Sequence, residues 1–221
     1  MKHLILFLAS LYCAVTAAAI TTITADDNSV YTVIGDPLLA GQDYYVVPYN
    51  YGDVGGGLTW KLKQELLAIC PHYYVLQVED NLNFGEPTAF FPSNSRQNQI
   101  TLSNKLNILF SKVSPPASPP FVCPASSNVW KVVADDSTGI VYVELGGRKG
   151  RSRDTNSWFT IEELDEGGYQ IKYCDSTKRK TASVCGGLGI VSLNGGRYLG
   201  VNATNPVAFA FETQQIFVKT A

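Results

Sequence analysis

Short apolar runs separated by turn-forming residues are the dominant pattern along this chain. The runs are rich in β-branched and aromatic side chains, which is typical of strands that are half buried or fully buried. Glycine, proline, asparagine or aspartate stands between the runs, and no segment has a sustained helical period. The predicted strands are Tyr44–Pro48, Tyr73–Val78, Leu106–Phe110, Val129–Val133, Ile140–Val143, Trp158–Ile161, Tyr169–Tyr173, Leu188–Leu193 and Ala208–Glu212.

Regularly spaced short strands of this kind predict an all-β barrel or sandwich, and the spacing alone does not choose between the two. The proline-rich stretch 111–120 is expected to be an extended surface connection, because proline cannot donate to a β-ladder. The glycines of Gly55–Gly57 and Gly186–Gly189 lack the residues of a phosphate-binding loop or a dinucleotide fingerprint. We therefore interpret both as turns.

The first residues have the features of a secretory leader. Lys2 precedes an apolar run over Leu4–Val15, and small residues follow at Ala17–Ala19. The run is shorter than the roughly 20 residues that a membrane helix needs. We expect a signal peptide over 1–19, a single domain over 20–221, and a soluble mature protein that does not interact with membranes.

Cysteine content and charge narrow the class further. Once Cys13 is assigned to the leader, four cysteines remain: Cys70, Cys123, Cys174 and Cys185. In an oxidising compartment they allow three alternative disulfide pairings. The formal net charge of -2 makes the chain a poor nucleic-acid binder. Without a Cys-x-x-Cys pair, and with His72 as the one histidine after the leader, we expect no metal site and no cofactor.

Catalytic patterns are nearly absent. His72 is the one candidate base for a serine or cysteine nucleophile, and the adjacent acidic pairs such as Glu162 and Glu163 point to opposite faces of a strand. The sequence therefore favours binding over catalysis. The basic stretch Gly146–Arg153 is interpreted as an exposed hairpin tip, with a sulfate, a phosphate or an acidic partner as the alternative. Asn202 begins a glycosylation sequon.

Several segments, in this order and spacing with the four cysteines, resemble the Kunitz-type soybean trypsin inhibitor family of plants. The similarity extends over essentially the whole chain after the leader. The matching segments are Gly35–Gly41 leading into Asp43–Pro48, Cys70 and Pro71 with Val75 and Gln77, Gly85–Phe90, Ile100 and Ser103 with Leu106–Phe110, Cys123 with Trp130 and Val132, Gly146 and Gly147, Trp158–Ile161, Tyr169–Cys174, and Cys185 with Gly189 and Ile190.

The resemblance implies a β-trefoil of twelve strands in a pseudo-threefold arrangement, with six strands in a short barrel and six capping it. It also implies disulfides joining Cys70 to Cys123 and Cys174 to Cys185. Family members are secreted plant defence proteins, extracellular or vacuolar, that inhibit serine proteases through one exposed, substrate-like loop. We accordingly expect a monomeric endopeptidase inhibitor that is not an enzyme.

The same resemblance places the inhibitory loop before Ile100, with Arg96 filling the specificity pocket of a trypsin-like protease. The flanking contacts would be Asn94, Ser95, Gln97 and Asn98. Asp36 stands where family members usually have an asparagine that supports the loop, and an ionised carboxylate can only accept hydrogen bonds. The alternative is a trefoil defence or storage protein whose binding is lost or redirected to cysteine proteases or a small ligand.

Overall fold

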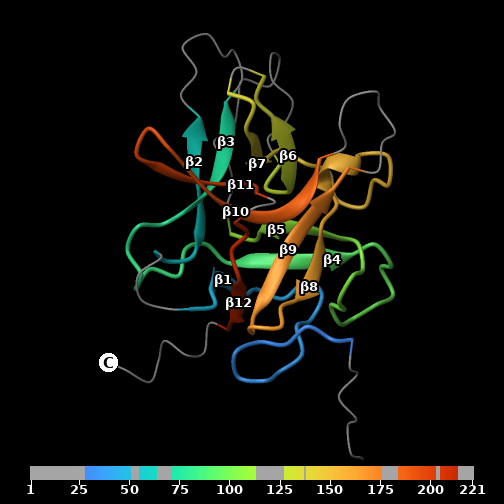
Figure 1. The fold of residues 1–221 in the computed structure, drawn as a ribbon. Helices are drawn as coiled ribbons and strands as arrows, with labels where there is room; N and C mark the ends of the chain where they lie inside the picture. The colour runs from blue at the N-terminus through green and yellow to red at the C-terminus, as the bar shows by residue number, and fades with distance from the viewer. Residues whose placement is uncertain are drawn as a thin grey trace, which may run out of the picture.

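The structure is a computed structural model that describes residues 28–50, 55–63, 71–112, 127–136, 138–175, 184–202 and 205–213. Within these ranges it contains twelve strands and one short 3-10 helix, η1 (Figure 1). Among the described residues, no helix is long and apolar enough to span a membrane. The elements are β1 (Tyr45–Pro48), β2 (Leu58–Lys63), β3 (His72–Gln77), β4 (Thr88–Pro92), β5 (Leu106–Phe110), β6 (Trp130–Ala134), β7 (Val141–Leu145), η1 (Thr155–Ser157), β8 (Thr160–Glu163), β9 (Tyr169–Cys174), β10 (Cys185–Leu193), β11 (Gly196–Val201) and β12 (Phe209–Glu212).

Six strands close into a ring. Antiparallel ladders join β1 to β12, β12 to β9, β9 to β8, and β4 to β5. Two isolated bridges complete the circuit: Tyr44, just before β1, pairs with Thr88 of β4, and Leu106 of β5 pairs with Phe159, just before β8. The ring leaves no open edge between these strands, which is how small all-β folds protect their backbone hydrogen-bonding groups.

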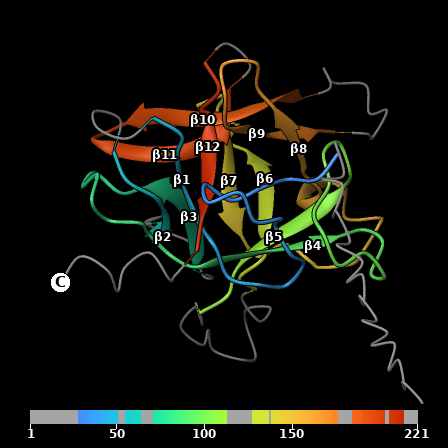
Figure 2. The same cartoon turned by 90° about the horizontal axis from the view of Figure 1, so that it is seen from below.

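The other six strands form three hairpins, β2–β3, β6–β7 and β10–β11, that cover one end of this ring (Figure 2). One strand of each hairpin pairs with the other two, through β3 with β7, β7 with β11, and β11 with β3. Three tyrosines meet where the hairpins meet. The ring centroid of Tyr74 lies 5.1 Å from that of Tyr142 and 4.9 Å from that of Tyr198. These contacts give the molecule the pseudo-threefold arrangement of a β-trefoil, as predicted.

Large apolar side chains from all parts of the chain fill the barrel. Trp130 packs edge-on against Phe110 and Phe159, with centroids 5.4 and 6.3 Å apart, and Phe90 packs against Phe211 at 5.2 Å. All five are at most 1% exposed. Edge-to-face packing of aromatic rings adds to the stabilisation that burial of their area provides. The core therefore joins residues far apart in sequence into one rigid unit.

The structure corrects the predicted turn at Gly186–Gly189. These residues lie inside β10, where a Cβ added at Gly187 would meet the Gln170 side chain at 2.5 Å, and one at Gly189 would meet the Asn205 carbonyl oxygen at 2.5 Å. Glycine is present there because neighbouring segments of the same chain approach the β10 backbone closely. The glycine pattern was therefore misread as a turn when it marks a crowded strand.

Candidate inhibitory loop

The candidate loop, residues 93–99, leaves the barrel at the end of β4. Pro92 pairs with Leu106, the first residue of β5, and the Ser93 N–H donates to the Lys105 carbonyl oxygen at 2.8 Å. The β4–β5 ladder thus continues to the first residue of the loop. Because β4 and β5 are barrel strands, the upstream end of the loop has a fixed position.

The tip of the loop is a tight turn. The Asn94 carbonyl oxygen accepts the Gln97 N–H at 3.0 Å, and the Asn94 side-chain oxygen accepts the Arg96 N–H at 3.2 Å. An asparagine at this position stabilises a turn by mimicking a backbone acceptor. Asn94, Ser95 and Arg96 are all exposed. Arg96 therefore stands on a projecting turn whose backbone is held from within.

The downstream end of the loop is anchored by the segment 38–40. The Ala40 N–H donates to the Asn98 carbonyl oxygen at 2.8 Å, and the Ile100 N–H donates to the Leu38 carbonyl oxygen at 2.8 Å. Ile100 is 1% exposed and so fixes the chain to the core. Both ends of the loop are therefore attached to buried parts of the fold.

A hydroxyl behind the loop links it to the following turn. The Thr101 Oγ1 accepts the side-chain amide of Gln97 at 2.7 Å and also accepts the side-chain amide of Asn104. Thr101 is 9% exposed, so this acceptor is shielded from water. Sequence reasoning missed Thr101 and Asn104, since single polar residues after a loop give no pattern that distinguishes a support from an ordinary surface residue.

Comparison with known proteins agrees with this architecture. A family model described as "Trypsin and protease inhibitor", that of the legume Kunitz proteins, matches residues 30–213. The chain belongs to this Kunitz family. Miraculin from Synsepalum dulcificum is 32% identical over 217 residues, which cover 96% of this chain and 94% of miraculin. Kunitz trypsin inhibitor 3 from Arabidopsis thaliana is 28% identical, with 76% of this chain and 68% of that protein covered.

Solved structures of Kunitz proteins are also similar to this one. Alocasin, a protease inhibitor from giant taro, Arum macrorrhizon, superposes with a TM-score of 0.59 at 28% identity, and the match covers 84% of this chain and 99% of alocasin. The fold class and the family predicted from sequence are therefore confirmed. Membership also places the chain in a family of inhibitors and not in a family of enzymes.

Asp36 is exposed, and its backbone pairs with Thr32. Its carbonyl oxygen accepts the Thr32 N–H at 2.8 Å, and its N–H donates to the Thr32 Oγ1 at 3.2 Å, so it closes a turn that is exposed over 33–36. The downstream end of the loop is instead hydrogen-bonded, among the described residues of segment 32–40, by the backbone of Leu38 and Ala40. The supporting role of Asp36 stays a prediction.

The remaining predicted residues of this Kunitz chain have mixed outcomes. The disulfide between Cys174 and Cys185 is present and joins directly opposed residues of β9 and β10. Cys70 and Cys123 lie outside the described residues, as do the leader 1–19 and most of the stretch 111–120. Asn202 is half buried, and its side-chain oxygen accepts the Asn205 N–H at 3.1 Å. Its glycosylation stays a prediction.

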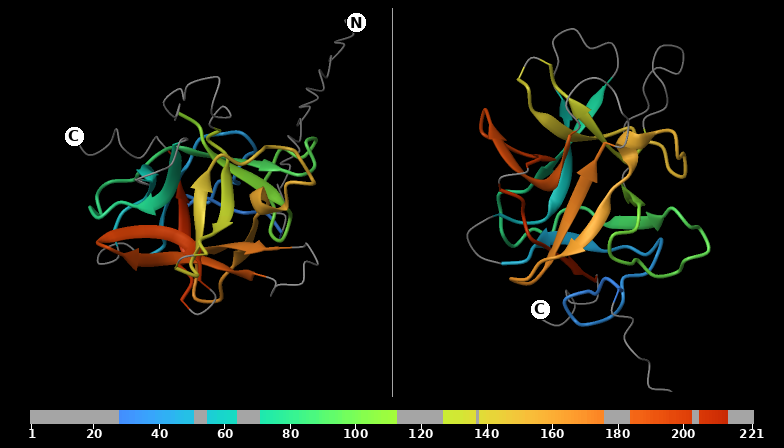
Figure 3. Two further views of the ribbon diagram at one scale, coloured as in Figure 1. Left: turned by 90° about the horizontal axis from the view of Figure 1, so that it is seen from above. Right: turned by 45° about the vertical axis from the view of Figure 1, so that its right-hand side comes forward.

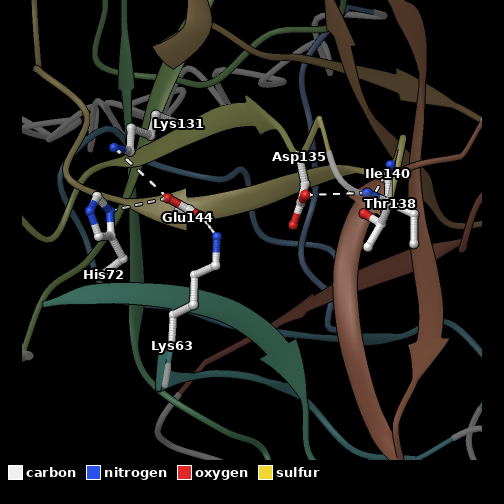
Figure 4. Close-up of polar contacts among 7 residues, drawn as sticks. All are labelled: Lys63, His72, Lys131, Asp135, Thr138, Ile140 and Glu144. Carbon is white, nitrogen blue, oxygen red and sulfur yellow. Dashed lines mark hydrogen bonds and ion pairs between the residues drawn. The ribbon is translucent and has the colours of Figure 1, made fainter. Parts of the chain in front are cut away.

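His72 belongs to an ion cluster and not to a nucleophile pair. Its Nδ1 lies 3.7 Å from the Glu144 carboxylate, which also has Lys63 Nζ at 3.6 Å and Lys131 Nζ at 3.9 Å (Figure 4). Glu144 is 2% exposed. No group of acidic, histidine or cysteine side chains among the described residues is arranged to hold a metal ion. The cluster joins β2, β3, β6 and β7, so it links two of the capping hairpins.

Proposed function

We propose that this Kunitz protein inhibits trypsin-like serine proteases, with Arg96 as the side chain that enters the specificity pocket. The observation that supports this most directly is an exposed arginine on a turn whose two ends are hydrogen-bonded to buried segments. A guanidinium pairs bidentately with the carboxylate at the base of a trypsin-like pocket. The name of the relative from Arabidopsis thaliana, a trypsin inhibitor, is in accord with this specificity.

The mechanism follows from the restrained loop. The turn leaves Asn94, Ser95 and Arg96 exposed, and a protease binds such a segment through hydrogen bonds to its backbone. A loop that already has its bound shape loses little conformational entropy on binding. The same restraints oppose the separation of the two ends after cleavage at Arg96–Gln97. The segment is therefore recognised as a substrate and released slowly.

Secretion fits this activity. The Cys174–Cys185 disulfide requires an oxidising compartment, and the predicted leader over 1–19 would deliver the chain there. An extracellular or vacuolar location would bring the inhibitor into contact with digestive proteases. We further propose that the mature chain acts as a monomer.

A redirected binding function is the second candidate. The relative at 32% identity, miraculin, is not named as a protease inhibitor. Under this hypothesis the loop would bind a cysteine protease, or another site would bind a small ligand. Titration of papain beside trypsin separates the two hypotheses.

The test is titration of trypsin, chymotrypsin and papain with purified mature protein and with Arg96→Ala. We expect tight inhibition of trypsin that weakens by about 2 to 7 kcal/mol of binding in Arg96→Ala, the magnitude of an interface hot spot. Arg96→Lys should retain inhibition because the pocket accepts either cation. Lys112→Ala, at an exposed lysine beyond β5, is the matched control and should inhibit like the wild type. Equal inhibition by Arg96→Ala would contradict the assignment of the site.

A further inference from the structure

A second exposed loop, residues 147–154, lies beside the inhibitory loop and contains four basic residues within six positions. We call it the basic loop. Its cations are Arg148, Lys149, Arg151 and Arg153, and all four are exposed. The whole chain has a formal net charge of -2, so this concentration of positive charge is opposite in sign to the protein as a whole.

The basic loop contacts the same rung of the β4–β5 ladder that leads into the inhibitory loop. Lys149 Nζ lies 3.8 Å from the centroid of the Phe91 ring, and Phe91 stands two residues before Ser93. The Gly150 N–H donates to the Asn107 side-chain oxygen at 2.8 Å, and Asn107 pairs with Phe91 across the ladder. The two loops therefore lie on the same side of the molecule (Figure 3).

Buried contacts give the basic loop a defined shape. The Asn107 side-chain amide donates to the Ser157 carbonyl oxygen at 2.6 Å, and Ser157 is fully buried. The Trp158 Nε1 donates to the Arg151 carbonyl oxygen at 3.0 Å. These bonds fix the backbone on both sides of the loop while the side chains of Arg151 and Arg153 remain exposed. The backbone that carries these charges is thus held beside the inhibitory loop.

A cleft of about 250 Å³ separates the two loops. Ser93 and Lys105 line it on the side of the inhibitory loop, Ser152 and Trp158 on the side of the basic loop, and Lys172 of β9 contributes a second lysine. The cleft also contains one carboxylate, that of Glu162, which accepts the Ser103 hydroxyl. Cations outnumber this carboxylate, so the surface joining the loops is positive.

We propose that the basic loop is a second contact surface for the inhibited protease and selects enzymes with acidic residues around the active-site cleft. The inference rests on the proposed inhibition through Arg96, because the loop acts on a protease already presented to that residue. Exposed charges of this kind steer the encounter, raising the association rate much more than they slow dissociation. The predicted partner is therefore an anionic trypsin-like protease.

The experiment measures association and dissociation rates of the full mature protein with an anionic and a cationic trypsin isoform. The test variant is Arg151→Gln/Arg153→Gln. The matched control is Lys61→Gln/Lys112→Gln, which also removes two positive charges. Lys61 is exposed on β2, and Lys112 is exposed after β5, at the end of the β4–β5 hairpin opposite the inhibitory loop. A third variant, Arg151→Lys/Arg153→Lys, retains the charge.

With anionic trypsin near 0.01 M ionic strength, we expect association of the arginine-to-glutamine variant to be about three- to tenfold slower than for the wild type. Dissociation should change less than about twofold, and the difference should disappear near 0.5 M salt. The control and lysine variants should associate like the wild type. With cationic trypsin, the glutamine variant should associate at least as fast as the wild type.

Two failures are distinguishable. If the wild type inhibits both trypsins but the test and control variants associate with anionic trypsin at equal rates, the inhibitory function stands and the basic loop is not a contact surface. If the wild type inhibits neither trypsin, the function proposed for Arg96 is wrong and the inference is wrong with it.

Discussion

The hydroxyl oxygen of Tyr44 accepts the backbone N–H of Leu39 at 2.9 Å. Leu39 pairs with Gln99, and its neighbours Leu38 and Ala40 form the hydrogen bonds that anchor the downstream end of the inhibitory loop. Tyr44 is buried, and burial raises the pKa of its phenol. The hydroxyl is therefore neutral at physiological pH, and a core residue determines where the supporting segment lies.

Tyr44→Phe should weaken inhibition although residue 44 does not contact a protease. Loss of the acceptor leaves the Leu39 N–H without its partner, which costs about 1 to 2 kcal/mol of folding free energy. The loop then loses part of its preorganisation, and we expect a trypsin inhibition constant about three- to tenfold higher. Urea unfolding and inhibition assays measure the two effects. An unchanged inhibition constant in a destabilised Tyr44→Phe would mean that segment 38–40 does not control the loop.

Thr101→Val tests the support behind the turn. Valine has the shape of threonine but cannot accept the side-chain amides of Gln97 and Asn104, so these donors lose a shielded acceptor. We expect inhibition to weaken by about 1 kcal/mol, and Arg96–Gln97 to be cleaved faster during long incubation with trypsin. Thr59→Val, in β2 of the capping hairpins, is the control. Equal cleavage rates for both variants would show that Thr101 is not a support.

Much of the fold was predictable because apolar runs report burial directly. Leu106–Phe110 was predicted with its observed bounds, since four of its five residues are buried. Strand β2 gave only a weak signal, from Trp60, because only Leu58 of its six residues is buried and lysines stand at two of them. Strand β11 was missed for a similar reason: Gly196 and Gly200 reduce its strand propensity, and tertiary pairing with β10 overrides that preference.

The site was predictable only as far as the resemblance located it. The position of Arg96 relative to Ile100 came from that likeness, and the structure shows the exposed turn that the prediction requires. The supports were not predictable, because they depend on tertiary contacts such as Tyr44 with Leu39 and Gln97 with Thr101. No local pattern encodes which backbone segment lies beneath a loop 60 residues away.

The tyrosines at the meeting point of the three hairpins should respond differently to loss of a hydroxyl. The Tyr142 hydroxyl is buried and has no hydrogen-bond partner within the described structure, whereas Tyr74 has Lys63 Nζ 5.0 Å from its ring centroid. Tyr142→Phe removes an unsatisfied group and should raise the free energy of unfolding by up to about 1 kcal/mol. Tyr74→Phe keeps the ring beside Lys63 and should not raise it. Urea unfolding measures both. An equal change in the two variants would contradict this assignment.

Glu144 should matter for stability and not for inhibition. Glu144→Gln leaves Lys63 and Lys131, whose side chains are 17% and 21% exposed, facing a neutral amide. Removing one member of a buried charge cluster costs about 3 kcal/mol, and partial exposure of the lysines should reduce the loss to about 1 to 2 kcal/mol. Glu166→Gln, at an exposed position, is the control. If Glu144→Gln also changed the trypsin inhibition constant, the stability of the capping hairpins would not be independent of the inhibitory loop, and this prediction would be wrong.

Glu212 should make stability depend on pH. It is 5% exposed in β12, and burial raises the pKa of its carboxyl above the usual 4.5. The folded state therefore favours the protonated form, so the contribution of Glu212 is fully present below about pH 4.5 and is lost as the pH rises through the folded-state pKa. Glutamine imitates the protonated form at every pH. Glu212→Gln should consequently have a higher melting temperature than the wild type at pH 7 and the same melting temperature at pH 3. The control is Glu163→Gln, at an exposed position, whose melting temperature should differ from that of the wild type by the same amount at pH 7 and at pH 3. A Glu212→Gln variant less stable than the wild type at pH 7 would mean that the carboxylate has a stabilising partner and is not a desolvated charge.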